Sequence, residues 1–241
     1  LSHESSGDTQ PHFLLEEFYR TALLVAGRYP IWWLVPPDQE DNYDAYVHRL
    51  LKQRFIDPLE CLDFGGLNVL PVGEFLGAAH WQLYKGIESP YKTILKLLLT
   101  ESYAQDYPHI RWLCQDAKRL IYSGEFDLQQ LDPYMLMYQR VEQYLTDRDE
   151  PKRLALAQRC LYFKAGLPMS IRTSARLQNW KHDLLQGMID EWGWNQTQLG
   201  HLDSRPRWKI GQVMEERKTL VHELTHSYRL LTNFAQEYAS V

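Results

Sequence analysis

Two helical patterns meet in the segment Trp81-Gln-Leu-Tyr-Lys-Gly-Ile-Glu-Ser-Pro-Tyr-Lys-Thr-Ile-Leu-Lys-Leu-Leu-Leu-Thr-Glu-Ser-Tyr103. Apolar residues recur at helical spacing on both sides of the Ser-Pro junction, which predicts helices over 71–87 and 90–107. Ser89 is a favourable N-cap and Pro90 suits the first helical position, so the second helix is expected to begin there. Such a pair is typical of a helical domain, in which each helix buries one face against the other.

The start of the second helix is a candidate anion site. The free N–H groups of a first helical turn and the helix dipole both favour an anion. Lys92 and Lys96 lie four residues apart on one helical face, and Lys85 approaches from the preceding helix. We therefore predict phosphate contacts for Ser89, Lys92, Lys96 and Lys85. The same residues also fit an ordinary capped helix with a solvated basic face.

Composition excludes several classes of protein. The 241 residues allow one large domain or two small ones, and the net charge of −5 gives no case for a nucleic-acid partner. No apolar run approaches the length of a membrane span, so we expect a cytoplasmic chain without one. The three cysteines, Cys61, Cys114 and Cys160, fit reduced thiols better than a disulfide framework.

The remaining pattern predicts a mainly α fold. One buried strand is expected at Ile31–Val35, a short apolar run rich in strand formers and bounded by prolines. A helix over 13–26 would precede it and end at Gly27. Further helices are predicted at about 38–54, 108–122, 133–146, 151–165, 173–192 and 207–238.

Many segments, all in the same order, resemble the class I adenylate cyclases, the large enterobacterial-type enzymes of bacteria. The closest likeness runs from Trp81 to Pro108. The segments that carry it are Leu14–Ala22, Trp32–Pro36, Asn42–Val47, Leu62–Leu67, Glu74–Ala78, Trp81–Lys85, Ser89–Leu99, Leu131–Tyr134, Glu191–Trp194, Trp208–Val213 and Ser227–Arg229.

The resemblance implies an enzyme that converts ATP into cyclic AMP and pyrophosphate. Its catalytic half is similar to polymerase-β-type nucleotidyltransferases, which pair a small sheet domain, the palm, with a helical domain. In such enzymes the palm carries a Gly-Ser turn followed by an Asp-x-Asp pair, with a third acidic residue on a neighbouring strand. These carboxylates hold two Mg²⁺ ions, which activate the ribose 3′-oxygen and stabilise the leaving pyrophosphate. The helical domain closes over the nucleotide and commonly supplies a lysine to the triphosphate.

The sequence departs from that pattern at the metal site. Asp147-Arg-Asp149 has the Asp-x-Asp spacing, but it lies between two predicted helices and lacks the Gly-Ser turn. The resemblance therefore implies that residues 1–37 are the tail of the palm and that residues 38–241 form the helical domain. The rest of the palm is expected upstream and a regulatory region downstream. We expect this segment to form the helical wall of the nucleotide site and to be inactive alone.

Two alternatives remain. One alternative interpretation is a helical interaction or regulatory module that never contacts nucleotide. The segment His222-Glu-Leu-Thr-His226 also matches the H-E-x-x-H pattern of zinc hydrolases, in which both histidines bind the metal and Glu223 is the general base. No third ligand follows at the usual spacing, so surface histidines beside a core stripe explain the segment better.

Overall fold

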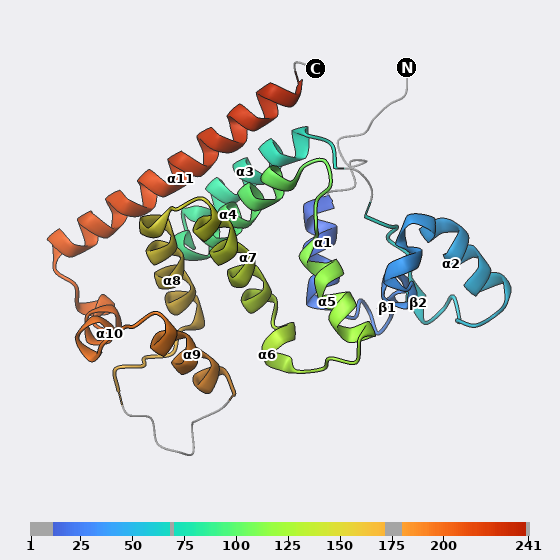
Figure 1. The fold of residues 1–241 in the computed structure, drawn as a ribbon, viewed down its shortest axis with the longest axis horizontal. Helices are drawn as coiled ribbons and strands as arrows, with labels where there is room; N and C mark the ends of the chain where they lie inside the picture. Colours follow the sequence, from blue (N-terminus) through green and yellow to red (C-terminus); the bar gives the residue numbers. More distant parts are fainter. Residues whose placement is uncertain (1–11, 68–69, 172–179, 240–241) are drawn as a thin grey trace.

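The computed structural model describes residues 12–67, 70–171 and 180–239. The mainly α prediction is confirmed: these ranges hold eleven α-helices, three 3-10 helices and one two-stranded sheet (Figure 1). The α-helices are α1 (His12–Thr21), α2 (Tyr43–Lys52), α3 (Gly73–Gly86), α4 (Pro90–Asp106), α5 (Leu113–Tyr122), α6 (Leu128–Leu131), α7 (Pro133–Asp147), α8 (Pro151–Ala165), α9 (Trp180–Glu191), α10 (Gln196–Asp203) and α11 (Ile210–Ala239). The short elements are η1 (Ile31–Leu34), η2 (Pro37–Asn42), η3 (Arg205–Arg207), β1 (Tyr29–Pro30) and β2 (Cys61–Leu62).

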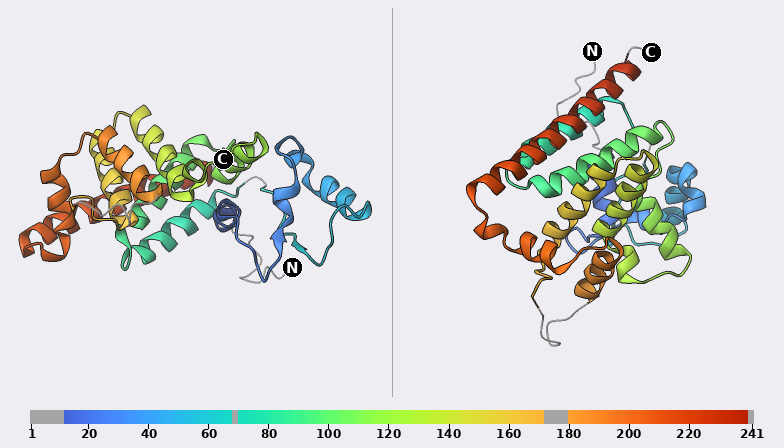
Figure 2. Two further views of the ribbon diagram at one scale, coloured as in Figure 1. Left: turned by 90° about the horizontal axis from the view of Figure 1, so that it is seen from below. Right: turned by 60° about the vertical axis from the view of Figure 1, so that its left-hand side comes forward.

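Helix α4 lies at the centre of the fold. It packs against α3, α7, α8 and α11, and 12 of its 17 residues are buried. A helix surrounded in this way is apolar on nearly all sides, which explains the run of leucines in its sequence. The long helix α11 passes along one side of the molecule beside α3 and α4 (Figure 2). The predicted helical pair is therefore correct, and it is the scaffold of the fold.

The strand predicted at Ile31–Val35 is wrong. These residues form η1, in which the N–H of Val35 donates to the main-chain oxygen of Trp32. The strand lies just before it, where β1 pairs in parallel with β2 and Tyr29 faces Cys61. A buried apolar run of this length satisfies either conformation, because burial alone does not select a backbone geometry.

Helix α1 is also shorter than predicted. It ends at Thr21, and Ala22 follows with a positive φ of 48°. Gly27 does not cap this helix. It adopts a φ of 78° in the tight turn where Val25 and Arg28 exchange main-chain hydrogen bonds.

Helix α10 was not predicted, although its start carries a recognisable signal. Asn195 accepts from the N–H of Gln198, whose side chain accepts in turn from the N–H of Asn195. This reciprocal pair is a capping box. The first part of the predicted helix over 173–192 lies outside the described residues, and α9 accounts for the rest.

Candidate nucleotide site

Ser89 occupies the predicted N-cap position of α4, and Pro90 follows at the first helical position. The Ser89 side chain is exposed and makes no capping hydrogen bond. Asp132, the N-cap of α7, does cap its helix, since its Oδ1 accepts from the N–H groups of Tyr134 and Met135 at 2.9 and 3.1 Å. The hydroxyl of Ser89 is therefore not needed to hold α4 in place.

This contrast predicts unequal effects on stability. Asp132→Ala should lower the free energy of unfolding by about 1 kcal/mol, the usual cost of a lost cap. Ser89→Ala should change it by less than about 0.5 kcal/mol, because no capping bond is lost. Urea unfolding of both variants measures the difference, and equal losses would contradict the assignment of the two caps.

Lys96 is held by an ion pair that the sequence did not predict. Its Nζ donates to both carboxylate oxygens of Glu17 on α1, at 2.6 and 2.7 Å. The Lys96 side chain is 17% exposed and that of Glu17 is 37% exposed. Its charge is therefore balanced within the structure, and it joins α1 to α4.

Lys85 and Lys92 lie in different surroundings. The Nζ of Lys85 lies 4.9 Å from the centroid of the Trp81 ring, within the range of a cation–π contact. Lys92 is half-buried, and its ammonium forms no ion pair or hydrogen bond with the described residues. Of the three lysines, Lys92 thus keeps the charge most available to a ligand.

A groove of about 620 Å³ separates α1 from α3. We call it the seam groove. Its lining residues are Phe13, Leu14, Glu17, Pro71, Gly73, Glu74, Gly77, Ala78, Trp81 and Gln82. A Cβ added at Gly73 or Gly77 would meet no atom within 4 Å, so part of the groove is bare helix backbone. Lys96 and Lys85 each contact a lining residue, Glu17 and Trp81 respectively.

A second groove, of about 820 Å³, begins where α4 begins. Pro90 and Tyr91 line it together with Arg205 of η3 and Arg217 of α11. The Arg205 guanidinium carbon lies 4.9 Å from the centroid of the Tyr91 ring, and burial raises the pKa of Tyr91 to about 12. Sequence reasoning missed both arginines, because they lie far downstream of Ser89 and no local pattern links them to it.

The H-E-x-x-H segment is not arranged as a hydrolase site. Glu223 is buried, and its Oε1 accepts from Nε of Arg153 at 2.7 Å. His222 and His226 are exposed on the outer face of α11. Glu223 is thus part of an internal ion-pair network and is not free to act as a general base. Across the described residues, no three His, Cys, Asp or Glu side chains are grouped so that they could hold a metal ion.

Two family models match the chain. The model described as "Adenylate cyclase, class-I, second domain" matches residues 70–240, and "Adenylate cyclase NT domain" matches residues 1–33. The chain belongs to the class-I adenylate cyclase family. In this chain, α1 falls within the N-terminal-domain match, while α3 and α4 fall within the second-domain match. The seam groove therefore lies where the two matched regions meet.

Curated relatives agree with this assignment. The adenylate cyclase of Salmonella typhimurium is 44% identical over 236 residues, that of Escherichia coli K12 is 43% identical over 236, and that of Proteus mirabilis is 39% identical over 237. The matches cover 98% of this chain but only 27–28% of each relative. No solved structure matches it. None of its described helices combines the length and apolar character that crossing a bilayer requires.

Proposed function

We propose that this chain is the helical part of an adenylate cyclase that converts ATP into cyclic AMP and pyrophosphate, and that it supplies one wall of the nucleotide site. Family membership supports the reaction. The observation that supports the wall is the seam groove, which lies between the two matched regions and has Lys96 and Lys85 in contact with its lining residues Glu17 and Trp81. Nucleotide sites commonly lie between domains, where two surfaces enclose the ligand.

The lysines would take different parts in binding. Lys85 contacts Trp81 of the groove, and Lys92 lies one helical turn before Lys96. We assign the triphosphate to Lys85 and Lys92, because neither ammonium is held by a carboxylate among the described residues. Lys96 fixes α1 against α4 through Glu17 and so sets the width of the groove. Ser89 lies at the start of the same helix and offers a hydroxyl that no capping bond occupies.

In this proposal, the residues that bind the metal ions lie in another part of the enzyme. No group of carboxylates in the described ranges suits a divalent cation, so these residues do not fit a two-metal centre. We assign Mg²⁺ to the palm and derive no metal-dependent step for this segment. Its own residues would bind and orient ATP and help to exclude water.

The wall is tested in the full-length protein by Lys92→Ala and Lys85→Ala. Each is expected to weaken MgATP binding about tenfold, since a hydrogen bond to a charged group is worth about 1.5–3 kcal/mol. Calorimetry and the KM of cyclic AMP synthesis measure the effect. Lys218→Ala, on an exposed part of α11 outside both grooves, is the matched control and should leave affinity unchanged.

One observation favours the alternative interaction module. Leu14 and Trp81 line the seam groove and remain 62% and 57% exposed, as expected of a surface that packs against protein. If the upstream palm fills this groove, Lys92→Ala and Lys85→Ala will leave MgATP affinity intact. Leu14→Asp would then lower the stability of the full-length protein more than Lys92→Ala does. Those two results together would mean that the seam groove packs against protein and does not bind the nucleotide.

A further inference from the structure

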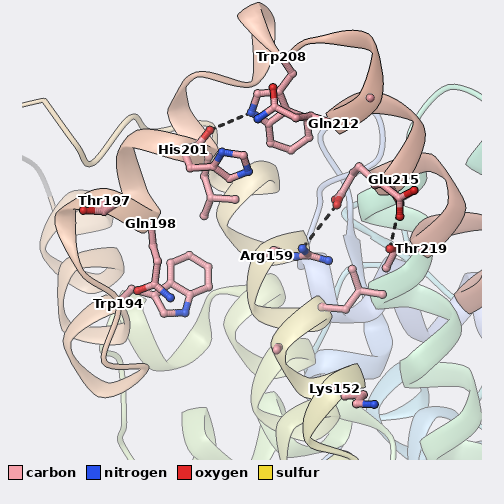
Figure 3. Close-up of a pocket in the computed structure, with 15 residues that line it drawn as sticks. Lys152, Arg159, Trp194, Thr197, Gln198, His201, Trp208, Gln212, Glu215 and Thr219 are labelled. Carbon is pink, nitrogen blue, oxygen red and sulfur yellow. Dashed lines mark hydrogen bonds and ion pairs between the residues drawn. The ribbon is translucent and has the colours of Figure 1, made fainter.

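A third groove, of about 850 Å³, lies between α10 and α11, with α8 as its floor (Figure 3). We call it the α8 groove. His201 on α10 and Trp194 just before α10 line one wall, Trp208 closes one end, and Arg159 projects from the floor (Figure 3). This volume falls within the range of sites that enclose small organic ligands.

Both indole rings of the α8 groove are held in place before any ligand arrives. Nε1 of Trp208 donates to the main-chain oxygen of His201 at 2.9 Å. The indole ring of Trp208 also stacks on the imidazole ring of His201, with centroids 5.1 Å apart. Trp194 packs against Trp192 and Tyr162, with ring centroids 4.8 and 5.6 Å apart. Because these rings are already ordered, stacking a flat ligand on them would cost little conformational entropy.

Arg159 has hydrogen-bonding capacity that the described residues do not use. Its Nε is buried without a hydrogen-bond partner, and its Nη1 lies 3.5 Å from Oε2 of Glu216, beyond an ordinary charge-assisted hydrogen bond. Arg153, on the same helix, instead donates to Glu101 and Glu223 at 2.7 Å each. Oε1 of Glu216 is also buried without a hydrogen-bond partner among the described residues, so the two side chains form a loose ion pair. The Nη groups of Arg159, whose side chain is 33% exposed, are the donors that a ligand in the groove would reach.

The other polar groups of the groove also offer donors. The side-chain oxygen of Gln198 accepts from the N–H of Asn195, and that of Gln212 accepts from the N–H of Lys209, which leaves both amide NH₂ groups to donate. Lys152 lies two helical turns before Arg159, about 10 Å along α8. Glu215 and Glu216 balance the two cations, so recognition would depend on directed donors and stacking more than on net charge.

We propose that the α8 groove binds a nucleoside phosphate: a flat ring rich in acceptors that stacks on the His201–Trp208 pair, with an anionic group on the Nη groups of Arg159. An acceptor-rich ring would use the two amides, and the span from Trp208 to Arg159 and Lys152 would accommodate a ring with its phosphate. The inference does not depend on the proposed nucleotide wall, because no residue of α1, α3 or α4 lines this groove.

The test is calorimetric titration of the full-length protein with AMP in EDTA, so that metal-dependent binding does not contribute. Wild type should bind AMP, and Arg159→Gln and Trp208→Leu should each weaken binding about tenfold. Arg207→Gln, an exposed arginine outside the groove, is the matched control. Trp208→Phe keeps an aromatic ring and should retain most of the affinity for AMP. It therefore still tests the role of the ring if Trp208→Leu does not fold.

Three ligands separate the sources of affinity. Adenosine should bind more weakly than AMP, and inorganic phosphate should bind more weakly still. Indole-3-acetate carries a ring and a carboxylate without a nucleoside, and equal binding of indole-3-acetate and AMP would overturn the nucleotide assignment. Absence of AMP binding, or AMP binding that is the same in wild type and Arg159→Gln, would overturn the site itself. Lys92→Ala should leave this titration unchanged, so the two proposals fail independently.

Discussion

Replacing Arg153 with methionine is expected to lower the free energy of unfolding by about 3–5 kcal/mol, the usual loss when one partner of a buried ion pair is removed. Arg153 donates to Glu101, which is 0% exposed, and to Glu223, which is 5% exposed. The hydroxyl of Tyr144 also donates to Glu101, at 2.9 Å. Without the guanidinium, two buried carboxylates would remain with no cation between them.

The protonation of this network agrees with that expectation. Burial alone would lower the pKa of Arg153, but the carboxylates of Glu101 and Glu223 raise it well above its ordinary value. Arg153 therefore stays charged at every pH at which the protein is folded. The network joins α4, α8 and α11, so its loss should loosen the centre of the fold.

Thermal and urea unfolding measure the effect of Arg153→Met. The midpoint should fall by about 10 °C, given about 2–4 °C per kcal/mol for a chain of this size. Arg119→Met is the control, because its side chain is 51% exposed and its pair with Asp116 is expected to contribute less than about 1 kcal/mol. A fall no larger than that of the control would show that the network carries little stability.

Trp32→Ala is expected to cost about 3–5 kcal/mol, because it removes a large buried ring and leaves a cavity. Trp32 is 1% exposed and stacks on Tyr19 with ring centroids 4.5 Å apart. The Nζ of Lys118 lies 3.6 Å from the centroid of Trp32, and it also donates to Glu40 at 2.7 Å. Burial lowers the pKa of Lys118, so the ring also supports a cation that is costly to bury.

Trp81→Ala is the matched control, since that ring is 57% exposed on α3. Its effect on urea unfolding should stay below about 0.5 kcal/mol. Equal losses for the two tryptophans would contradict the assignment of Trp32 to the core. Trp32→Phe should recover part of the loss, because a smaller ring still fills most of the space.

Local patterns were sufficient where the signal lies within a few residues. Helix α8 begins at Pro151 and ends at Ala165, as predicted, and Pro90 opens α4. Proline at a first helical position and apolar residues at helical spacing act over one or two turns, so they can be read without knowing the partners. The family resemblance also rested on sequence alone, and the family comparisons confirm it.

Local patterns failed where two conformations bury the same side chains. The run Ile31–Val35 satisfies a strand or a 3-10 turn equally well, and the stacking of Trp32 on Tyr19 and its contact with Lys118 exist only in the folded chain. The H-E-x-x-H pattern offered Glu223 as a general base, but the carboxylate pairs with Arg153, which lies on another helix.

The sequence by itself therefore determined most of the helices, the family and the candidate residues Ser89, Lys85, Lys92 and Lys96. Only the tertiary structure decided that Lys96 is held by Glu17, that Arg205 and Arg217 line a groove beside Pro90, and that Arg159 keeps an unpaired buried N–H. The physical reason is distance along the chain. Helix formation depends on neighbouring residues, whereas the charge and accessibility of a side chain depend on which distant helices pack around it.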